Sequence, residues 1–269
     1  MAAELPKETP TVLVSQERGV RTLSLNRPER MNAVDADLSM ELVARLGEAS
    51  RDPSVRALVL TGVGRGFCAG IDLAQVQSAY DTPPPALGDW VRRDFNPMIR
   101  ALMHLEKPVI AAVHGVAAGA GLGLALACEY RIVEPESRLV LAFPNVGVSL
   151  DSGTSYFLPR ILGLGRTWEW ILSGRTIHGE EAVAFGLAQQ MAPPGQALEL
   201  AQALAGRIAQ GPTAAYGLMK RSLLYGSSQD LEAALDLEAE LQGLAGLTND
   251  HVEGVRAFLA KRSAHFTGR

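Results

Sequence analysis

Apolar and polar residues alternate along the first half of this chain in a way that predicts strands and helices in turn. Residues 11–25 predict two short strands around a polar, glycine-containing turn, and 36–50 predict a helix with Asp35 as its N-cap. Apolar strands are predicted over 55–62 and 108–115, each followed by a glycine-rich loop. Helices over 90–105 and 122–130 and two more short strands within 131–143 complete this part.

The pattern changes from about residue 160, where helical spacing dominates. It predicts five helical segments, near 166–173, 179–186, 196–210, 213–225 and 230–262, the last broken near Leu247. Residues 78–89 contain three consecutive prolines and predict a lid or surface loop. Strands alternating with helices and then a run of helices indicate an α/β fold with a helical C-terminal region.

Composition narrows the class of protein. The chain has 269 residues, 47% of them hydrophobic, with a net charge of −4 and no long charged block, which argues against nucleic-acid or membrane-surface partners. Cys68 and Cys128 have neither CxxC nor zinc spacing, so no metal site is expected and a reduced, cytoplasmic protein is predicted. Residues 1–10 lack a signal-peptide pattern, and the apolar stretch 108–128 fits a buried strand, loop and helix better than a membrane span.

Two glycine-rich loops are the first candidates for chemistry. Residues 64–73 (GRGFCAGIDL) and 114–127 (HGVAAGAGLGLALA) each follow a predicted strand, and the second runs into a helix. Glycine lets the backbone turn its N–H groups into a cavity, and a helix start adds unpaired donors. Two such donors aimed at one point would stabilise a carbonyl oxygen that gains negative charge. The alternatives are that the glycines only form turns or close packing, or that GAGLGL is a partial nucleotide-binding motif.

A single acid marks the third candidate. Residues 139–160 (LVLAFPNVGVSLDSGTSYFLPR) are mostly apolar, and Asp151 is their one charged residue before Arg160. A buried carboxylate must find donors, stay protonated or take part in chemistry. Asp151 also precedes a predicted helix, where Asp is a favoured N-cap, so a structural role and a chemical role both remain open.

Five segments of the sequence carry a family resemblance. They are NRPERMNAV, GFCAGIDL, KPVIAAVHGVAAGAGLGLALACEYRI, FPNVGVSLDSGTSYFLPRILG and SGRTIHGEEAVAFGLAQQM. Their order and spacing over residues 11–262 resemble those of the enoyl-CoA hydratase/isomerase (crotonase) superfamily. The resemblance implies a spiral of ββα units over residues 1–195 and a C-terminal helical trimerisation region over 196–269. It also implies a homotrimer or a hexamer made of two trimers.

The same resemblance implies an acyl-CoA thioester as substrate, with coenzyme A as part of that substrate and no separate cofactor. The thioester oxygen would lie between the backbone N–H groups of Ile71 and of Ala120 or Gly119. The implied contacts to coenzyme A are Ala69, Asp72 and Leu73 for the adenine, Arg30 and Met31 for the pantetheine or phosphates, and Lys261 and Phe266 for the nucleotide end.

The reaction depends on side chains rather than on the fold. Hydratases of this family use two glutamates, and the matching positions here are Gly123 and Asn145. An Asn can orient water but cannot exchange protons near neutral pH, so ordinary hydration is not expected. Phe143 and Tyr156 are expected to line the acyl pocket with these two residues.

Asp151 resembles instead the single acid of ring-epoxide, dienoyl and Δ3,Δ2-enoyl-CoA isomerases. Such a carboxylate can take a proton from one carbon and return it to another, which moves the double bond. DSGTSY also resembles aryl-CoA dehalogenases, but their tryptophan and histidine correspond here to Phe143 and Phe95. The leading prediction is therefore an isomerase. A hydratase using Asp151 and Asn145, a dehalogenase-like enzyme and a CoA-ester-binding subunit with little catalysis are the alternatives.

Overall fold

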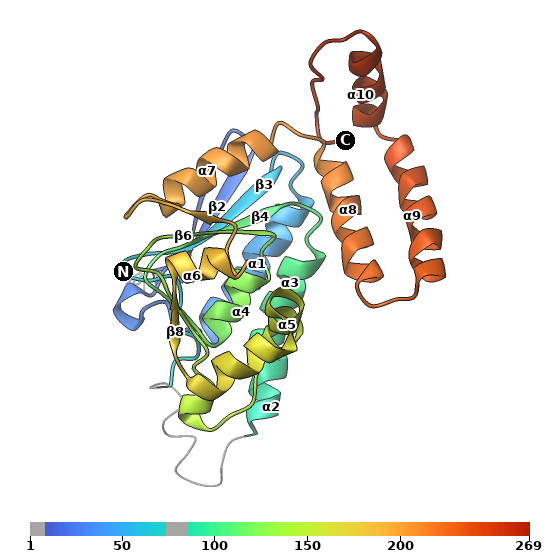
Figure 1. The fold of residues 1–269 in the computed structure, drawn as a ribbon. Helices are drawn as coiled ribbons and strands as arrows, with labels where there is room; N and C mark the ends of the chain where they lie inside the picture. Colours follow the sequence, from blue (N-terminus) through green and yellow to red (C-terminus); the bar gives the residue numbers. More distant parts are fainter. Residues whose placement is uncertain (1–8, 74–85) are drawn as a thin grey trace, which may run out of the picture.

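Two sheets form the body of the protein in this computed structural model, which describes residues 9–73 and 86–269 (Figure 1). Within these residues, six strands pair in the order β1-β2-β3-β4-β6-β9 and three in the order β5-β7-β8. The strands are β1 (Val12–Glu17), β2 (Val20–Leu25), β3 (Ala57–Gly62), β4 (Val109–Val113), β5 (Val116–Ala118), β6 (Tyr130–Val133), β7 (Arg138–Val140), β8 (Thr176–His178) and β9 (Gln190–Met191).

The chain passes from the large sheet to the small one and back in repeated turns. β4 leads directly into β5, and β6 leads into β7. In the same way β3 leads to Cys68, which forms a parallel bridge with Ala117 beside the small sheet. β2, β3, β4, β6 and β9 are parallel neighbours, so the segments that follow them emerge at one edge of the large sheet. This is the predicted spiral of ββα units, and it collects the glycine loops at one place.

Helices cover the sheets and extend beyond them. They are α1 (Ala36–Arg51), α2 (Leu87–Trp90), α3 (Asn96–His104), α4 (Ala120–Leu126), α5 (Thr154–Ser173), α6 (Gly179–Ala184), α7 (Ala197–Ile208), α8 (Thr213–Gly226), α9 (Leu231–Gly246) and α10 (Asn249–Leu259). A π-helical turn, Val91–Phe95, joins α2 to α3, and short 3-10 helices span Pro28–Arg30 and Pro144–Val146. None of the helices in the described residues is both long and apolar enough to cross a membrane.

The core divides into two packed layers. Most large apolar side chains, among them Leu60, Phe67 and Trp170, form one cluster between the large sheet and helices α1, α3, α4 and α5. A second cluster lies on the other face of the large sheet, where the small residues of α7 pack on Val59 and Ile110. The continuous burial of β3 and β4 is expected for parallel strands that are covered on both faces.

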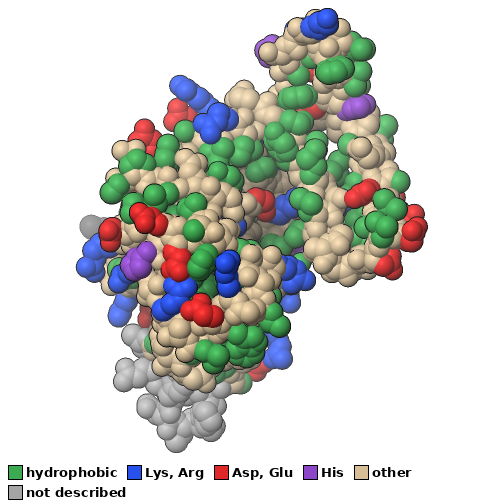
Figure 2. Space-filling model, in the orientation of Figure 1, with side chains coloured by type: hydrophobic (Ala, Val, Ile, Leu, Met, Phe, Trp, Pro, Cys, Tyr) green, Lys and Arg blue, Asp and Glu red, His purple; other side chains and the backbone are tan. Residues whose placement is uncertain are grey.

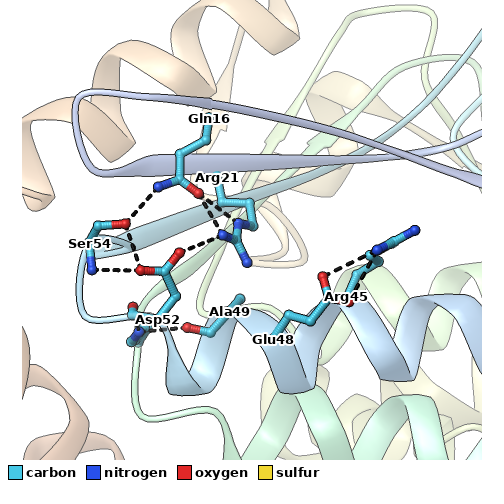
Figure 3. Close-up of polar contacts among 8 residues, drawn as sticks. Gln16, Arg21, Arg45, Glu48, Ala49, Asp52 and Ser54 are labelled. Atoms are coloured by element: carbon cyan, nitrogen blue, oxygen red, sulfur yellow. Dashed lines mark hydrogen bonds and ion pairs between the residues drawn. The ribbon is translucent and has the colours of Figure 1, made fainter.

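Polar contacts fix the end of α1 against the β1–β2 hairpin (Figure 3). Arg21 donates to Gln16 Oε1 and to Asp52 Oδ2, and Asp52 also accepts from Ser54. Farther back on α1, Arg45 pairs with Glu48 on the exposed side of the helix. These contacts hold the C-terminal end of α1 in place. The segment that precedes its N-terminal end reaches the candidate site.

The helices of the C-terminal part follow the predicted order. The predicted break near Leu247 separates α9 from α10, and the predicted helices over 196–210 and 213–225 correspond to α7 and α8. The helix expected over 166–173 is the second part of the longer α5. α7 packs on the sheet, and the helices that project from the body begin with α8 (Figure 1). A division at residue 195 stays a prediction, as does the lid over 78–89, most of which lies outside the described residues.

Candidate active site

The two glycine loops lie against each other at the edge where β3 and β4 end. The Cys68 N–H donates to the Val116 carbonyl (3.0 Å), and the Ala118 N–H donates to the Cys68 carbonyl (2.9 Å). Gly70 then passes so close to the second loop that a Cβ on it would lie 2.8 Å from the Ala118 oxygen and 3.5 Å from the Ala120 nitrogen. Its φ of +91° also favours glycine. The main chains of the two loops therefore meet without side chains between them.

Two main-chain donors at this meeting point have no partner among residues 9–73 and 86–269. The Val34 N–H donates to the Gly70 carbonyl and the Asp72 N–H to the Val34 carbonyl, so the Ile71 N–H points to the opposite side of the strand. Ala120 begins α4, where a helical N–H has no partner in its own helix. Neither amide donates to any other described residue. The third predicted donor is different, because the Gly119 N–H bonds to the Val140 carbonyl (3.1 Å). Ile71 and Ala120 are therefore the pair available to a ligand.

A buried ion cluster supports the first donor. Arg27 pairs with Asp72 (2.9 Å) and Asp35 (3.0 Å), and these three side chains are 5–10% exposed. Arg27 also donates to the Ala33 carbonyl. The cluster joins the segment before α1 to the residue after Ile71, so it stabilises the direction of the Ile71 amide.

Asp151 lies in a separate loop that leads into α5. Its carbonyl accepts from the N–H (3.0 Å) and the Oγ1 (2.7 Å) of Thr154, so only its main chain contributes to the start of the helix. The N-cap of α5 is Gly153, and no side chain caps it. Among the described residues, the carboxylate accepts a hydrogen bond from Ser152 Oγ alone (2.8 Å). Of the two roles left open by the sequence, the structure does not show a helix cap made by the Asp151 side chain, because the turn places Gly153 at the N-cap position.

Burial in this apolar loop raises the pKa of Asp151 above its ordinary value, and the hydrogen bond from Ser152 partly opposes that shift. No described cation forms an ion pair with the carboxylate. A carboxyl group with a raised pKa is a better proton acceptor when ionised and a ready donor when protonated.

Contact with α4 brings the acid loop beside the donors. A Cβ on Gly123 would lie 2.3 Å from the Ser152 oxygen, so the main chain after Asp151 rests on that glycine. Gly123 is one helical turn from Ala120, about 4.5 Å along the axis of α4. The acid loop therefore packs against the same helix whose first residue, Ala120, supplies one of the two amides.

The predicted acyl-pocket residues separate in the structure. Phe143 is buried, and its ring is 4.0 Å from a Cβ placed on Gly119, so it lies beside the donor loop. Asn145 is exposed, with its Oδ1 near Gly174 at the far end of α5, and does not meet Gly123. The Tyr156 hydroxyl turns to Ser227 (3.1 Å), so this side chain joins α5 to the α8–α9 connection.

The predicted coenzyme A contacts form two groups. Ala69 and Leu73 flank Ile71, Arg30 is exposed nearby, and the Met31 carbonyl accepts from the Ala69 N–H (3.0 Å). The Asp72 carboxylate is committed to Arg27, so Asp72 can offer a ligand only its carbonyl.

Lys261 and Phe266 lie elsewhere. Lys261 is exposed beyond α10, and the Phe266 carbonyl accepts from Arg56 (3.0 Å), which precedes β3. The first glycine loop follows the other end of β3, six residues or about 20 Å away. Within one chain, Lys261 and Phe266 therefore do not lie beside the two glycine loops.

The remaining candidates for chemistry are the two cysteines, a metal site and the histidine position of the dehalogenase resemblance. Burial raises the pKa of both the Cys68 and the Cys128 thiol to about 12, so neither is a nucleophile. No cluster of ligating side chains that could hold a metal occurs in the described part of the chain. Phe95, in the histidine position of the dehalogenase resemblance, is a buried hydrophobic side chain.

Two supporting side chains were not predicted from the sequence. Arg27 stands in the NRPER motif, two residues after the end of β2, and a charged residue that close to a buried strand is a signal of a buried pair. Ser152 adopts φ of +51°, which the sequence signals only through the glycine that follows it.

A carbonyl oxygen placed between two main-chain amides, as those of Ile71 and Ala120 could hold it, would be polarised. The Enoyl-CoA hydratase/isomerase family model matches residues 15–269, and the chain belongs to that family, whose enzymes act on acyl-CoA thioesters.

Individual relatives agree with this assignment. The chain is 42% identical over 258 residues to the 1,2-epoxyphenylacetyl-CoA isomerase of Escherichia coli, covering 96% of this chain and 98% of that one. It is 39% identical over 259 residues to a probable enoyl-CoA hydratase of Rhodobacter capsulatus, with the same coverage. The crystal structure of a putative enoyl-CoA hydratase/isomerase from Mycobacterium abscessus superposes with a TM-score of 0.90 at 39% identity, covering 96% of this chain and all of that one.

Proposed function

We propose that this protein is an acyl-CoA isomerase in which Asp151 moves a proton between carbons of the acyl chain. The Ile71 and Ala120 amides hold the thioester oxygen and stabilise the enolate that forms when a carbon-bound proton is removed. Asp151 takes that proton and returns it to another carbon, so the double bond shifts.

The observation that carries this proposal is the contact between the Asp151 loop and α4. Gly123 and Asn145 stand at the two acid positions of the hydratase pattern, and a side chain at position 123 would collide with Ser152. Asn145 is exposed and turned towards the far end of α5. This arrangement supports proton transfer by a single group over addition of a held water.

Replacing Asp151 by Asn tests the proposal. The Asp151→Asn variant is expected to lose at least about 100-fold in the conversion of a 3-enoyl-CoA to the 2-enoyl isomer, because the proton acceptor is removed. Binding of the CoA ester, measured by calorimetry, should be unchanged. Asn145→Ala is the control and should isomerise like the unsubstituted protein. Full turnover by Asp151→Asn, or loss of turnover in Asn145→Ala, would contradict the proposal.

Isomerisation of a ring epoxide is a second candidate, favoured by the 42% identity to the 1,2-epoxyphenylacetyl-CoA isomerase. The two candidates use the same donors and acid but different acyl groups. Assay of both substrates under one condition separates them, since the true substrate will show the larger kcat/KM.

We also propose assembly through α8–α10, as the trimer expected from the family requires. Apolar side chains lie on the surface of this helical region (Figure 2). Leu247 is 85% exposed and Phe258 82%. A groove of about 660 Å³ between the three helices is lined mainly by apolar residues. Sedimentation equilibrium is expected to give three or six times the 28.7 kDa of one chain.

A further inference from the structure

Ser152 is the one described side chain that touches the Asp151 carboxylate. Its hydroxyl lies 2.8 Å from Asp151 Oδ1, and the residue is 2% exposed. The other oxygen, Oδ2, accepts no hydrogen bond from the described residues. The serine therefore occupies one carboxylate oxygen and leaves the second open.

The backbone holds Ser152 in this position from both sides. Its φ of +51° is unusual for a residue with a side chain, and Gly153 follows with φ of +76°. On one side the Ser152 carbonyl rests on Gly123; on the other, the Phe157 ring covers Gly153, where a Cβ would come within 2.6 Å of it. The Ser152 main chain is thus held by packing that does not involve the carboxylate.

Other charges near Asp151 are few. α4, which packs on α5, has no ionisable side chain, and neither has the segment 144–150. On α5 the Tyr156 hydroxyl is directed to Ser227, and the Arg160 guanidinium lies over the Tyr156 ring at 3.6 Å. The serine hydroxyl is thus the main polar influence on this carboxylate within the described residues.

We propose that Ser152 is a positioning residue that keeps the Asp151 carboxylate ionised, with Oδ2 free to accept the substrate proton. A donor to the charged form of an acid stabilises that form, whereas burial in the apolar loop disfavours it. Without the hydroxyl, a larger share of the protein would hold a protonated Asp151 that cannot act as base. This inference rests on the proposed role of Asp151.

The test measures the titration of Asp151 in two ways. The first is the pH dependence of kcat/KM for isomerisation, whose acidic limb reports the ionisation of the base. The second is ¹³C NMR of protein labelled at the aspartate carboxyl carbons, with the Asp151 signal assigned by its absence in Asp151→Asn. NMR requires no turnover, so it separates failure of this inference from failure of the proposed function.

Ser152→Ala is expected to move both titrations to higher pH by about one unit, because a hydrogen bond to a charged group is lost. Ser152→Gly, which also relieves the positive φ, should show the same shift. Thr154→Val is the control, since the Thr154 hydroxyl bonds to the Asp151 carbonyl and not to its carboxylate, and it should leave both titrations unmoved.

An unchanged NMR titration in Ser152→Gly would overturn the inference, as would an equal shift in Thr154→Val. If the NMR signal shifts but the acidic limb does not, the hydroxyl controls Asp151 and the proposed catalytic role of Asp151 fails.

Discussion

The donor loops and the acid loop both pack at helix α4 but are built in different ways. The donors are main-chain amides, fixed by parallel bridges between Cys68 and Ala117 and between Val34 and Ile71. The acid is a side chain, and its loop is held by packing on one glycine of α4. The first arrangement depends on backbone geometry and a buried ion cluster, whereas the second depends on which residue stands at each position. If the proposed function holds, the two amides supply the part of the site that depends on the backbone, and Asp151 the part that depends on residue type.

The largest expected effect is on the buried ion cluster of the donor side. Arg27→Met leaves Asp35 and Asp72 without their shared cation, and is expected to lower the free energy of unfolding by about 3–5 kcal/mol. Urea denaturation measures this change. Arg45→Met, which removes the more exposed pairs of Arg45 with Glu41 and with Glu48, the latter drawn in Figure 3, should lower it by less than about 1 kcal/mol. Equal losses of unfolding free energy in the two variants would contradict this prediction, because burial of the Arg27 cluster would then add nothing to its contribution to stability.

The next effect tests the meeting of the two donor loops. Gly70→Ala places a Cβ 2.8 Å from the Ala118 oxygen at a φ of +91°, so the loops must separate. Turnover of the enoyl-CoA is expected to fall about 100- to 1,000-fold, as for loss of one oxyanion donor, with Asp151 still in place.

The control for Gly70 is Gly64→Ala. Gly64 has a similar φ of +82°, but its Cβ would meet Pro28 and not the second loop. It is expected to lose stability with a much smaller loss of turnover. A full loss of turnover in Gly64→Ala would show that general strain, and not the position of the donors, controls the rate.

The smallest of the three effects concerns the acid loop. Gly123→Ala puts a Cβ 2.3 Å from the Ser152 oxygen, so the Asp151 loop must move away from α4. A displacement of about 1 Å is expected to lower kcat about 100-fold with the donors unchanged. Steady-state kinetics measure the change.

Gly206→Ala is the matched control for that variant, because a Cβ there meets nothing within 4 Å in helix α7. It should gain about 0.5–1 kcal/mol of stability and keep full turnover. Normal turnover in Gly123→Ala would show that the acid loop does not depend on α4.

Much of the fold could be predicted from the sequence because the strands and helices have clear periods. The strand pattern of residues 55–62 and the helical spacing of 213–225 correspond to β3 and α8. The start of α5 was harder to predict, because Asp151, Ser152 and Gly153 all precede an apolar run. Only the conformation of the turn shows that Gly153 is the N-cap. The choice of Ala120 over Gly119 as donor also needed the structure, because it depends on a bond to Val140 from another turn of the spiral.

The sequence by itself determined the family, the two glycine loops and the single acid, because these are properties of residue type and order. Only the tertiary structure decided that Ile71 and Ala120 are the unpaired donors and that the Asp151 side chain does not cap a helix. It also showed that Gly123 supports the acid loop. The physical reason is that each of these facts concerns which groups remain unpaired after distant segments have bonded to one another, and local sequence does not record those partners.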